Sequence, residues 1–380
     1  MTASNDAVTA FLALYGYRPE GVWSAPGRAN LIGEHTDYND GLALPFAINF
    51  RTYAAVSPRE DREVRVWSRE ENSDPVIWSL DSDPPTQYGW ASYPLGVVSL
   101  MANNHETGLD IAIASDVPVG AGLSSSAALE CAIAVAVREL WGTSHTATDL
   151  AAIGARAEND IVGAPTGTMD QLASMLGQQH HAIAIDFHTQ HSMHVPLAVA
   201  DDGLSLVIVD SGQRHDHATG GYGERRAVCD TIPGALGISS LRDVSEDTLT
   251  EALAELDEEQ GRLLTHVVTE NRRVHDAIDA LTDGDYAAVG DLLRQSHRSL
   301  RDDFRVSTEY IDALVDALTG AGAIGARLCG GGFGGSVIAL IPDEKLSAAK
   351  DYIASMPPAP GAQEAPTLRV VTPEHGAGKN

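Results

Sequence analysis

Lysine is the scarcest charged residue in this chain of 380 residues. It occurs only as Lys345, Lys350 and Lys379, whereas arginine occurs 22 times. Chemistry that needs a lysine earlier in the chain is therefore excluded. One example is the Walker A phosphate loop, because the pattern GxxxxGK[ST] ends on a lysine and a hydroxyl.

Basic residues as a whole are outnumbered, since 25 Lys and Arg face 53 Asp and Glu and give a formal charge of -28. So negative a molecule repels phosphate backbones and anionic lipid surfaces unless a local basic patch overrides the field. No run of basic residues does so. We expect neither a nucleic acid nor a membrane as a partner.

Cysteine and long apolar runs are also scarce. Cys131, Cys229 and Cys329 are too few and too widely spaced for a disulfide framework or a CxxC zinc site, which favours a reducing cytoplasm. No apolar stretch approaches the roughly 20 residues of a membrane helix, and residues 1–10 do not resemble a signal peptide. The length and a hydrophobic content of 43% instead favour a soluble protein with two domains.

The chain mixes helical and strand patterns without an internal repeat. Because strands and helices do not alternate regularly, we expect an α+β fold with a domain boundary near 190–205. A capping box from Thr146 to Asp149 predicts a helix that runs to about residue 161 and ends at Gly163. Strands are expected at 53–56, 63–67, 111–114, 182–186, 205–209 and 336–341, and other helices at 123–140, 249–280, 286–299 and 308–318.

Residues 118–126, PVGAGLSSS, join an expected strand to the helix that begins near Ser124. Gly120 and Gly122 permit a tight turn whose amides converge on one point, and the helix directs its free N–H groups and positive dipole end there. An anion, most simply a phosphate, suits this point, and the serine hydroxyls can donate to it or bind magnesium. The alternative is a glycine turn with a serine N-cap.

Without lysine, phosphate charge must be neutralised by magnesium, the helix dipole or arginine. Glu158, on the helix that follows Thr146, is a candidate carboxylate ligand of magnesium. The alternative is a solvated helix charge beside Arg156.

Residues 25–41 form a polar, loop-like stretch that contains Arg28, Glu34, His35, Asp37 and Tyr38. This density of donors and acceptors suits a polyhydroxylated ligand such as a sugar. A metal site is the rival interpretation, although the spacing is not that of helical zinc ligands. An ordinary polar turn is the other alternative.

Asp170 lies in the first turn of another expected helix, where Thr168 and Gln171 have capping-box spacing. The dipole favours an ionised carboxylate there, so Asp170 either complements the helix end or acts as base or anchor for a substrate hydroxyl. Further on, residues 329–336, CGGGFGGS, hold five glycines. They allow close approach of a backbone or ligand, so we expect this loop to pack against the phosphates or the first glycine loop, a flexible linker being the alternative.

Taken together, PGRANLIGEHTDYNDG, PVGAGLSSSAALE and CGGGFGGS resemble the three motifs of the galacto-, homoserine, mevalonate and phosphomevalonate (GHMP) kinase superfamily. The first has the galactokinase form, and GTMDQLAS and HRSLRDDF extend the match in order along almost the whole chain. The resemblance implies transfer of the ATP γ-phosphoryl group to the C1 hydroxyl of galactose. The product is galactose 1-phosphate, as in galactose catabolism by the Leloir pathway.

The resemblance also implies roles for individual residues. Asp170 and Arg28 would be catalytic, with Arg28 holding Asp170 ionised and stabilising developing charge. The sugar would contact Glu34, His35, Asp37, Gly167 and Tyr222. ATP would bind to Gly120, Ala121, Gly122, Leu123, Ser124, Ser125 and Ser126, magnesium to Ser126 and Glu158, and the third motif, Gly331, Gly332, Gly334 and Gly335, would close over the site.

The fold implied by the resemblance has an N-terminal domain of the ribosomal-protein-S5-domain-2 type, residues 1–195, and a ferredoxin-like C-terminal domain, residues 196–380, with the site in the cleft between them. Galactose and MgATP would be its partners, and the molecule would be a cytoplasmic monomer or weak homo-oligomer. Two alternatives stand beside this. One is a sister kinase for N-acetylgalactosamine, galacturonate or arabinose, and the other is a galactokinase-like sensor that contacts a transcription regulator.

Overall fold

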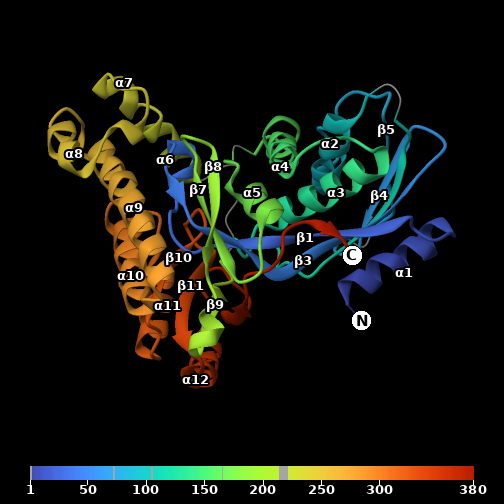
Figure 1. Cartoon of the computed structure of the whole chain (residues 1–380). Helices are drawn as coiled ribbons and strands as arrows, with labels where there is room; N and C mark the ends of the chain where they lie inside the picture. Colours follow the sequence, from blue (N-terminus) through green and yellow to red (C-terminus); the bar gives the residue numbers. More distant parts are fainter. Residues whose placement is uncertain (1, 72, 104–105, 165, 214–220) are drawn as a thin grey trace.

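The computed structural model describes residues 2–71, 73–103, 106–164, 166–213 and 221–380 (Figure 1). A six-stranded sheet has the order β13-β1-β3-β6-β4-β5, and every pair in it is antiparallel except β4 with β6. Its strands are β1 (Gly21–Asn30), β3 (Pro45–Pro58), β4 (Glu63–Ser68), β5 (Val76–Ser79), β6 (Leu109–Ser115) and β13 (Gly378–Lys379).

Alternation of side chains along β3 and β6 explains how helices cover both faces of this sheet. Val56 and Ile111 point to one face and pack against α2 (Ser92–Met101) and α3 (Ser125–Trp141). The small residues Ala55 and Ala112 point to the other, where they contact α1 (Ala3–Tyr15) through Phe11. The alanine-rich pattern of α3 fits its position, since ten of its residues are buried.

The second sheet is antiparallel, with the order β10-β11-β9-β12. On one face lie Val207 and Val337, within the core formed with α11, and on the other Ile208 and Ile338, which pack toward α9 and α10. The elements of this half are β9 (Leu204–Asp210), β10 (Gly325–Cys329), β11 (Ser336–Pro342), β12 (Thr367–Val371), α9 (Glu258–Asp283), α10 (Tyr286–Asp302), α11 (Glu309–Gly320) and α12 (Asp343–Ala354).

The two sheets share a core, because Leu31, Ile32 and Phe46 near β1 and β3 belong to the same cluster as Ile338 of β11 and Val274 of α9. A third sheet, β2-β7-β8, completes the strands. The remaining elements are β2 (Leu42–Ala43), β7 (His181–Asp186), β8 (His191–Pro196), α4 (Ala147–Arg156), α5 (Met169–Leu176), α6 (Gly221–Cys229), α7 (Ile232–Leu236) and α8 (Glu246–Leu253).

The α+β class and all six expected strands are confirmed, and so is the capping box of Thr146 and Asp149 at the start of α4. This helix continues as a π-helical segment, Ala157–Val162, and stops at Gly163 with φ 84°. The division into residues 1–195 and 196–380 stays a prediction. Strand pairing crosses it, because β13 at the end of the chain pairs with β1.

Three local expectations are wrong. Residues 25–30 are not loop but the second half of β1. The helix expected over 249–280 is two helices, α8 and α9, because Asp257 accepts a hydrogen bond from the Gln260 amide and starts a new one. Thr168 makes no side-chain cap to α5, and the Gln171 side chain turns into the protein toward Glu130 and Glu158.

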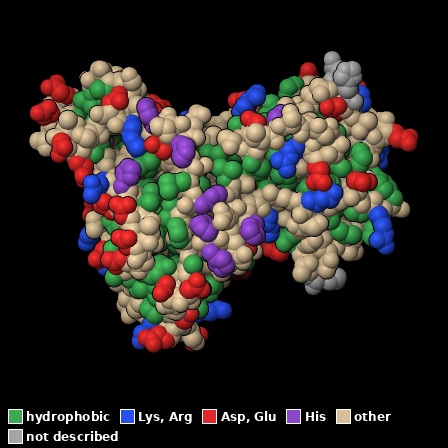
Figure 2. Space-filling model, viewed as in Figure 1, with side chains coloured by type: hydrophobic (Ala, Val, Ile, Leu, Met, Phe, Trp, Pro, Cys, Tyr) green, Lys and Arg blue, Asp and Glu red, His purple; other side chains and the backbone are tan. Residues whose placement is uncertain are grey.

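The charged side chains on the face shown in Figure 2 reflect the acidic composition of the chain. Figure 2 shows carboxylates along the outer side of the helical half, histidines gathered near β7 and β8, and basic side chains scattered among acidic neighbours. Within the described ranges, no helix is both long and apolar enough to cross a bilayer. Cys131, Cys229 and Cys329 are buried free thiols.

Candidate active site

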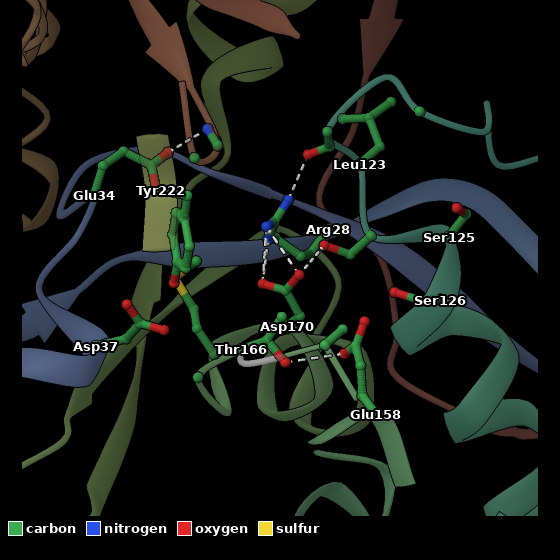
Figure 3. Close-up of a pocket in the computed structure, with 18 of the residues that line it drawn as sticks. Arg28, Glu34, Asp37, Leu123, Ser125, Ser126, Glu158, Thr166, Asp170 and Tyr222 are labelled. Carbon is green, nitrogen blue, oxygen red and sulfur yellow. Dashed lines mark hydrogen bonds and ion pairs between the residues drawn. The ribbon is translucent and has the colours of Figure 1, made fainter. Parts of the chain in front are cut away.

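A cavity of about 300 Å³ lies where the first half of the chain meets residues of the second. Figure 3 shows Arg28 and Asp170 at its centre, Glu34, Asp37 and Tyr222 on one side, and Ser125, Ser126 and Glu158 on the other. The expected site residues that line it are Arg28, Glu34, His35, Asp37, Gly120, Gly122, Leu123, Ser124, Ser125, Ser126, Glu158, Gly167, Asp170, Tyr222 and Gly331.

Four residues expected at the site do not line this cavity: Ala121, Gly332, Gly334 and Gly335. Ala121 is fully buried, and its carbonyl accepts a hydrogen bond from Ser336 Oγ at 2.6 Å. This bond ties the first glycine loop to the third motif. A Cβ on Gly330 would also lie within 3.9 Å of Gly122 Cα, so the expected packing of the two loops is confirmed.

An ion pair between Arg28 and Asp170 occupies the centre of the cavity. Arg28 comes from β1 just after a bulge, and Asp170 is in the first turn of α5. Arg28 Nε donates to Asp170 Oδ1 at 2.9 Å, Nη2 donates to Oδ2 at 3.0 Å, and Nη1 donates to the Gly122 carbonyl at 2.6 Å. This fork fixes the plane of the carboxylate while its side chain stays 29% exposed to the cavity.

Burial and charge act in opposite directions on Arg28. Burial alone lowers its pKa, but Asp170, Cys329 and Glu34 together outweigh burial, so the pKa is raised above its usual value. The guanidinium is therefore a fixed positive charge beside the carboxylate. A permanent cation here offers a site for negative charge that develops nearby.

Ser124 makes a further contact with Asp170. Its hydroxyl donates to Asp170 Oδ2. Ser124 stands at the N-cap of α3 with φ 56° and ψ 53°, and its side chain makes no bond to the helix. The simple N-cap interpretation of this serine is therefore wrong.

Carboxylates and aromatic rings form the side of the cavity next to motif one. Glu34 Oε1 accepts from the Gly330 amide at 2.7 Å and from the buried Arg327 at 3.2 Å, which holds the side chain in place. The His35 ring lies 4.5 Å from the Phe304 ring and 5.5 Å from that of Tyr222. Burial lowers the His35 pKa to about 3, so the imidazole is neutral at physiological pH.

Asp37 lies in the same wall. Burial, and then the charges of Asp170 and Glu34, raise its pKa to about 7. Gly167 fits against it so closely that a Cβ there would lie 1.8 Å from Asp37 Oδ2. A side chain at position 167 would therefore force Asp37 to move.

The opposite side of the cavity combines the start of α3 with Glu158. The Glu158 carboxylate accepts from Gln171 Nε2 at 2.9 Å and from Thr166 Oγ1 at 3.2 Å. Its pKa is raised by burial and then by the charge of Asp170. Among the described residues no group of three or more His, Cys, Asp or Glu could hold a metal by itself, so the zinc alternative for motif one has no support.

The resemblance did not single out every residue that lines the cavity. Thr166 and Met169 lie beside residues that it did identify, so their sequence position was a usable signal. Tyr93 lies on α2, far from any motif, and nothing in its neighbourhood marked it. Gln171 was expected to cap α5, whereas it supports Glu158 instead.

Comparisons with known proteins agree with this geometry. The galactokinase galactose-binding signature matches residues 9–58, the GHMP kinases N terminal domain residues 92–178, and the GHMP kinases C terminal domain residues 277–359. The galactokinase of Streptomyces coelicolor is 44% identical over 372 residues, which cover 97% of this chain and 96% of that protein. The galactokinase of Mycobacterium tuberculosis is 43% identical over 333 residues, 87% of this chain and 92% of that protein.

A solved structure, Lactococcus lactis galactokinase complexed with galactose, superposes with a TM-score of 0.91 at 28% identity and covers 98% of both chains. Three motifs converge on one cavity, and these relatives match along almost the whole length. The chain therefore belongs to the galactokinase family of the GHMP kinases.

Proposed function

We propose that this protein phosphorylates galactose at the C1 hydroxyl with ATP, giving galactose 1-phosphate and ADP as in the Leloir pathway. The observation that carries the proposal is the position of the Arg28–Asp170 pair. It lies between a wall of carboxylates on one side and a lysine-free loop of glycines and serines on the other. A sugar hydroxyl and a phosphate can both reach the pair.

In the reaction, the C1 oxygen forms a bond to the γ-phosphorus while the bond from that phosphorus to the ADP oxygen breaks. ADP leaves with the electron pair, and Asp170 accepts the proton of the hydroxyl. Because such transition states are loose, Asp170 contributes mainly by orienting the hydroxyl and taking its proton late. Arg28 stabilises the negative charge that develops beside Asp170.

Galactose would lie against Glu34, His35, Asp37, Gly167 and Tyr222. Carboxylates accept hydrogen bonds from neighbouring hydroxyls, and Gly330 and Arg327 hold Glu34 in place through Oε1. The Tyr222 ring offers an apolar surface to the sugar face. A neutral hexose needs no attractive field, which is compatible with a charge of -28.

ATP phosphates would bind the loop from Gly120 to Ser126, whose glycines have φ 73° and 69° at positions 120 and 122. Ser126 and Glu158 direct side-chain oxygens toward the same space. Proteins commonly bind magnesium through one or two carboxylates together with the phosphate oxygens of the substrate. When bound, magnesium supplies neutralisation of phosphate charge. The glycine loop, Ser126, Glu158 and magnesium would together take the place of the lysine in a Walker A loop.

The finer description of the fold is part of the same proposal. Residues 1–195 would form the domain of the ribosomal-protein-S5-domain-2 type and residues 196–380 the ferredoxin-like domain, with the site in the cleft between them. Support comes from a cavity whose lining combines Arg28 and Asp170 with Tyr222 and Gly331. We also propose a cytoplasmic monomer or weak homo-oligomer without nucleic-acid or membrane partners, in keeping with three free thiols and the strong negative charge.

The test is release of ADP from MgATP with galactose, N-acetylgalactosamine, galacturonate and arabinose assayed in parallel. We expect the highest kcat/KM for galactose. A higher value for one of the analogues would assign the protein to a sister sugar kinase. Sugar-dependent binding of a regulator with no ADP release would instead identify a sensor.

A further inference from the structure

The three serines at the start of α3 have different surroundings. Ser125 and Ser126 belong to the first turn of the helix, and Ser126 lies on the same side of the cavity as Glu158. Ser124 precedes the helix in the left-handed region, with φ 56° and ψ 53°. A residue with a Cβ rarely adopts that conformation, and where one does the surroundings hold it there.

The conformation of Ser124 determines which hydrogen bond its hydroxyl makes. At an N-cap, serine ordinarily accepts a hydrogen bond from an amide of the first helical turn, but Ser124 makes no such bond. Its hydroxyl donates instead to Asp170 Oδ2, across 46 residues of sequence. The first amides of α3 are therefore not occupied by this side chain.

Asp170 is nearly saturated as an acceptor. An ionised carboxylate offers about four lone-pair sites. Arg28 uses sites on both oxygens, through Nε to Oδ1 and Nη2 to Oδ2, and the Ser124 hydroxyl uses another on Oδ2. A substrate hydroxyl must donate to the lone-pair site that remains. Arg28 and Ser124 together therefore determine the direction from which the hydroxyl approaches Asp170.

We propose that Ser124 is a positioning residue for Asp170 and not a ligand of the nucleotide phosphates through its hydroxyl. The inference rests on the proposed function and deepens it. Arg28 fixes the plane of the carboxylate from β1, and Ser124 holds Oδ2 from the glycine loop. The loop that receives ATP and the base that receives the sugar hydroxyl are thereby joined by one hydrogen bond.

Two variants separate the hydroxyl from the backbone. Ser124→Ala removes the hydroxyl and keeps a Cβ at positive φ, whereas Ser124→Gly removes the hydroxyl and suits the left-handed backbone. For both we expect kcat to fall by about 10- to 100-fold, as for misplacement of a reacting group, while calorimetric ATP affinity changes by less than about threefold. Ser125→Ala is the matched contrast from the same loop, and we expect it to weaken ATP binding.

A double-mutant cycle tests whether the effect passes through Asp170. Calorimetric galactose affinity is measured for wild type, Ser124→Ala, Asp170→Asn and the double variant. We expect Ser124→Ala to weaken galactose binding in the wild-type background and to have little further effect once Asp170 is Asn. A merely structural role for the loop would give additive losses.

The proposal is overturned if both Ser124 variants keep kcat within twofold of wild type, if their loss lies mainly in ATP affinity, or if the cycle is additive. These results differ from failure of the proposed function itself. In that case the wild-type protein would not phosphorylate galactose at all.

Discussion

Asp170 combines a fixed orientation with access to the cavity. Its oxygens are bonded to Arg28 and Ser124, yet the side chain is 29% exposed. Asp170→Asn removes the anion and preserves the volume, so we expect kcat to fall by about 10²- to 10⁴-fold while the protein remains folded. Steady-state kinetics with a parallel melting curve check this. Near-normal turnover would remove Asp170 from the catalytic role.

Arg28 acts through its shape as well as its charge. It donates to both oxygens of Asp170 and to the Gly122 carbonyl, which a single ammonium group cannot reproduce. We expect Arg28→Lys to retain a positive charge but to lose at least about tenfold in kcat/KM. Wild-type kinetics for this variant would show that charge alone is sufficient.

Asp37 should make galactose binding depend on pH. Its pKa of about 7 in the free protein is set by burial and by the charges of Asp170 and Glu34. Sugar hydroxyls favour the ionised form, so the contribution of Asp37 is complete above pH 7 and is lost as the pH falls below it. We expect galactose affinity at pH 6 to be about tenfold weaker than at pH 8.

Calorimetric galactose titrations from pH 5.5 to 8.5 measure this dependence. Asp37→Asn is the control, because an amide cannot titrate in this range and its affinity should be flat. A wild-type profile as flat as that of the variant would contradict the assignment.

Residue chemistry and family resemblance together identified most of the site. Arg28, Asp170 and Glu158 were expected there, and all three line the cavity. The contact of Ser124 with Asp170 could not be predicted, because the left-handed backbone of a serine depends on a partner 46 residues away. Local sequence favoured an N-cap at that position, and tertiary structure provided a different acceptor.

At the scale of secondary structure, Gly332 of the third glycine motif is constrained both by its backbone conformation and by its neighbours. Gly332 has φ 87°, and a Cβ there would lie 2.5 Å from Val306 Cβ and 2.6 Å from its carbonyl oxygen. We expect Gly332→Ala to lower the free energy of unfolding by about 2–4 kcal/mol, measured by urea denaturation.

Gly320→Ala is the matched control for that variant. Gly320 ends α11, and a Cβ there meets nothing within 4 Å. We expect a change of less than about 1 kcal/mol, of either sign. Equal losses for the two variants would mean that the contact with Val306 does not constrain the loop.

Secondary structure was predictable where apolar residues form a short continuous run, as along β9 and β11, or recur with helical spacing, as along α10. The second half of β1 was missed because Arg28 and Asn30 are polar yet buried. The partner of Arg28, Asp170, comes from a distant segment. A pattern of polarity alone indicates a loop for such a strand.

Across the whole molecule, the buried Glu270 connects α9 to motif one and to α10. It accepts from the Gly33 amide at 3.0 Å, from Arg273 at 2.7 Å and from Ser296 at 2.6 Å. Burial alone would raise its pKa, but Arg273, His266 and Arg327 outweigh burial and lower it to about 2. We expect Glu270→Gln to lower the free energy of unfolding at pH 7 by about 2–4 kcal/mol.

The direction of the pH effect follows from this lowered pKa. Glu270 contributes its full stabilisation above its ordinary pKa of 4.5, and loses it as the pH falls toward 2. Denaturation curves at pH 7 and pH 3 should therefore show a smaller difference between wild type and Glu270→Gln at the lower pH. Glu258→Gln, on the exposed start of the same helix, should differ from wild type by less than about 0.5 kcal/mol at both.

The arrangement of the complete site is tested most directly by one distance, from the Asp170 carboxylate to the C1 oxygen of galactose. It can be measured in a crystal structure with galactose and a nonhydrolysable ATP analogue bound. We predict a hydrogen-bond distance of about 2.6–3.2 Å, with the γ-phosphate on the Ser126 side of that oxygen. An Asp170 side chain directed into solvent, away from the bound hexose, would contradict the proposed chemistry.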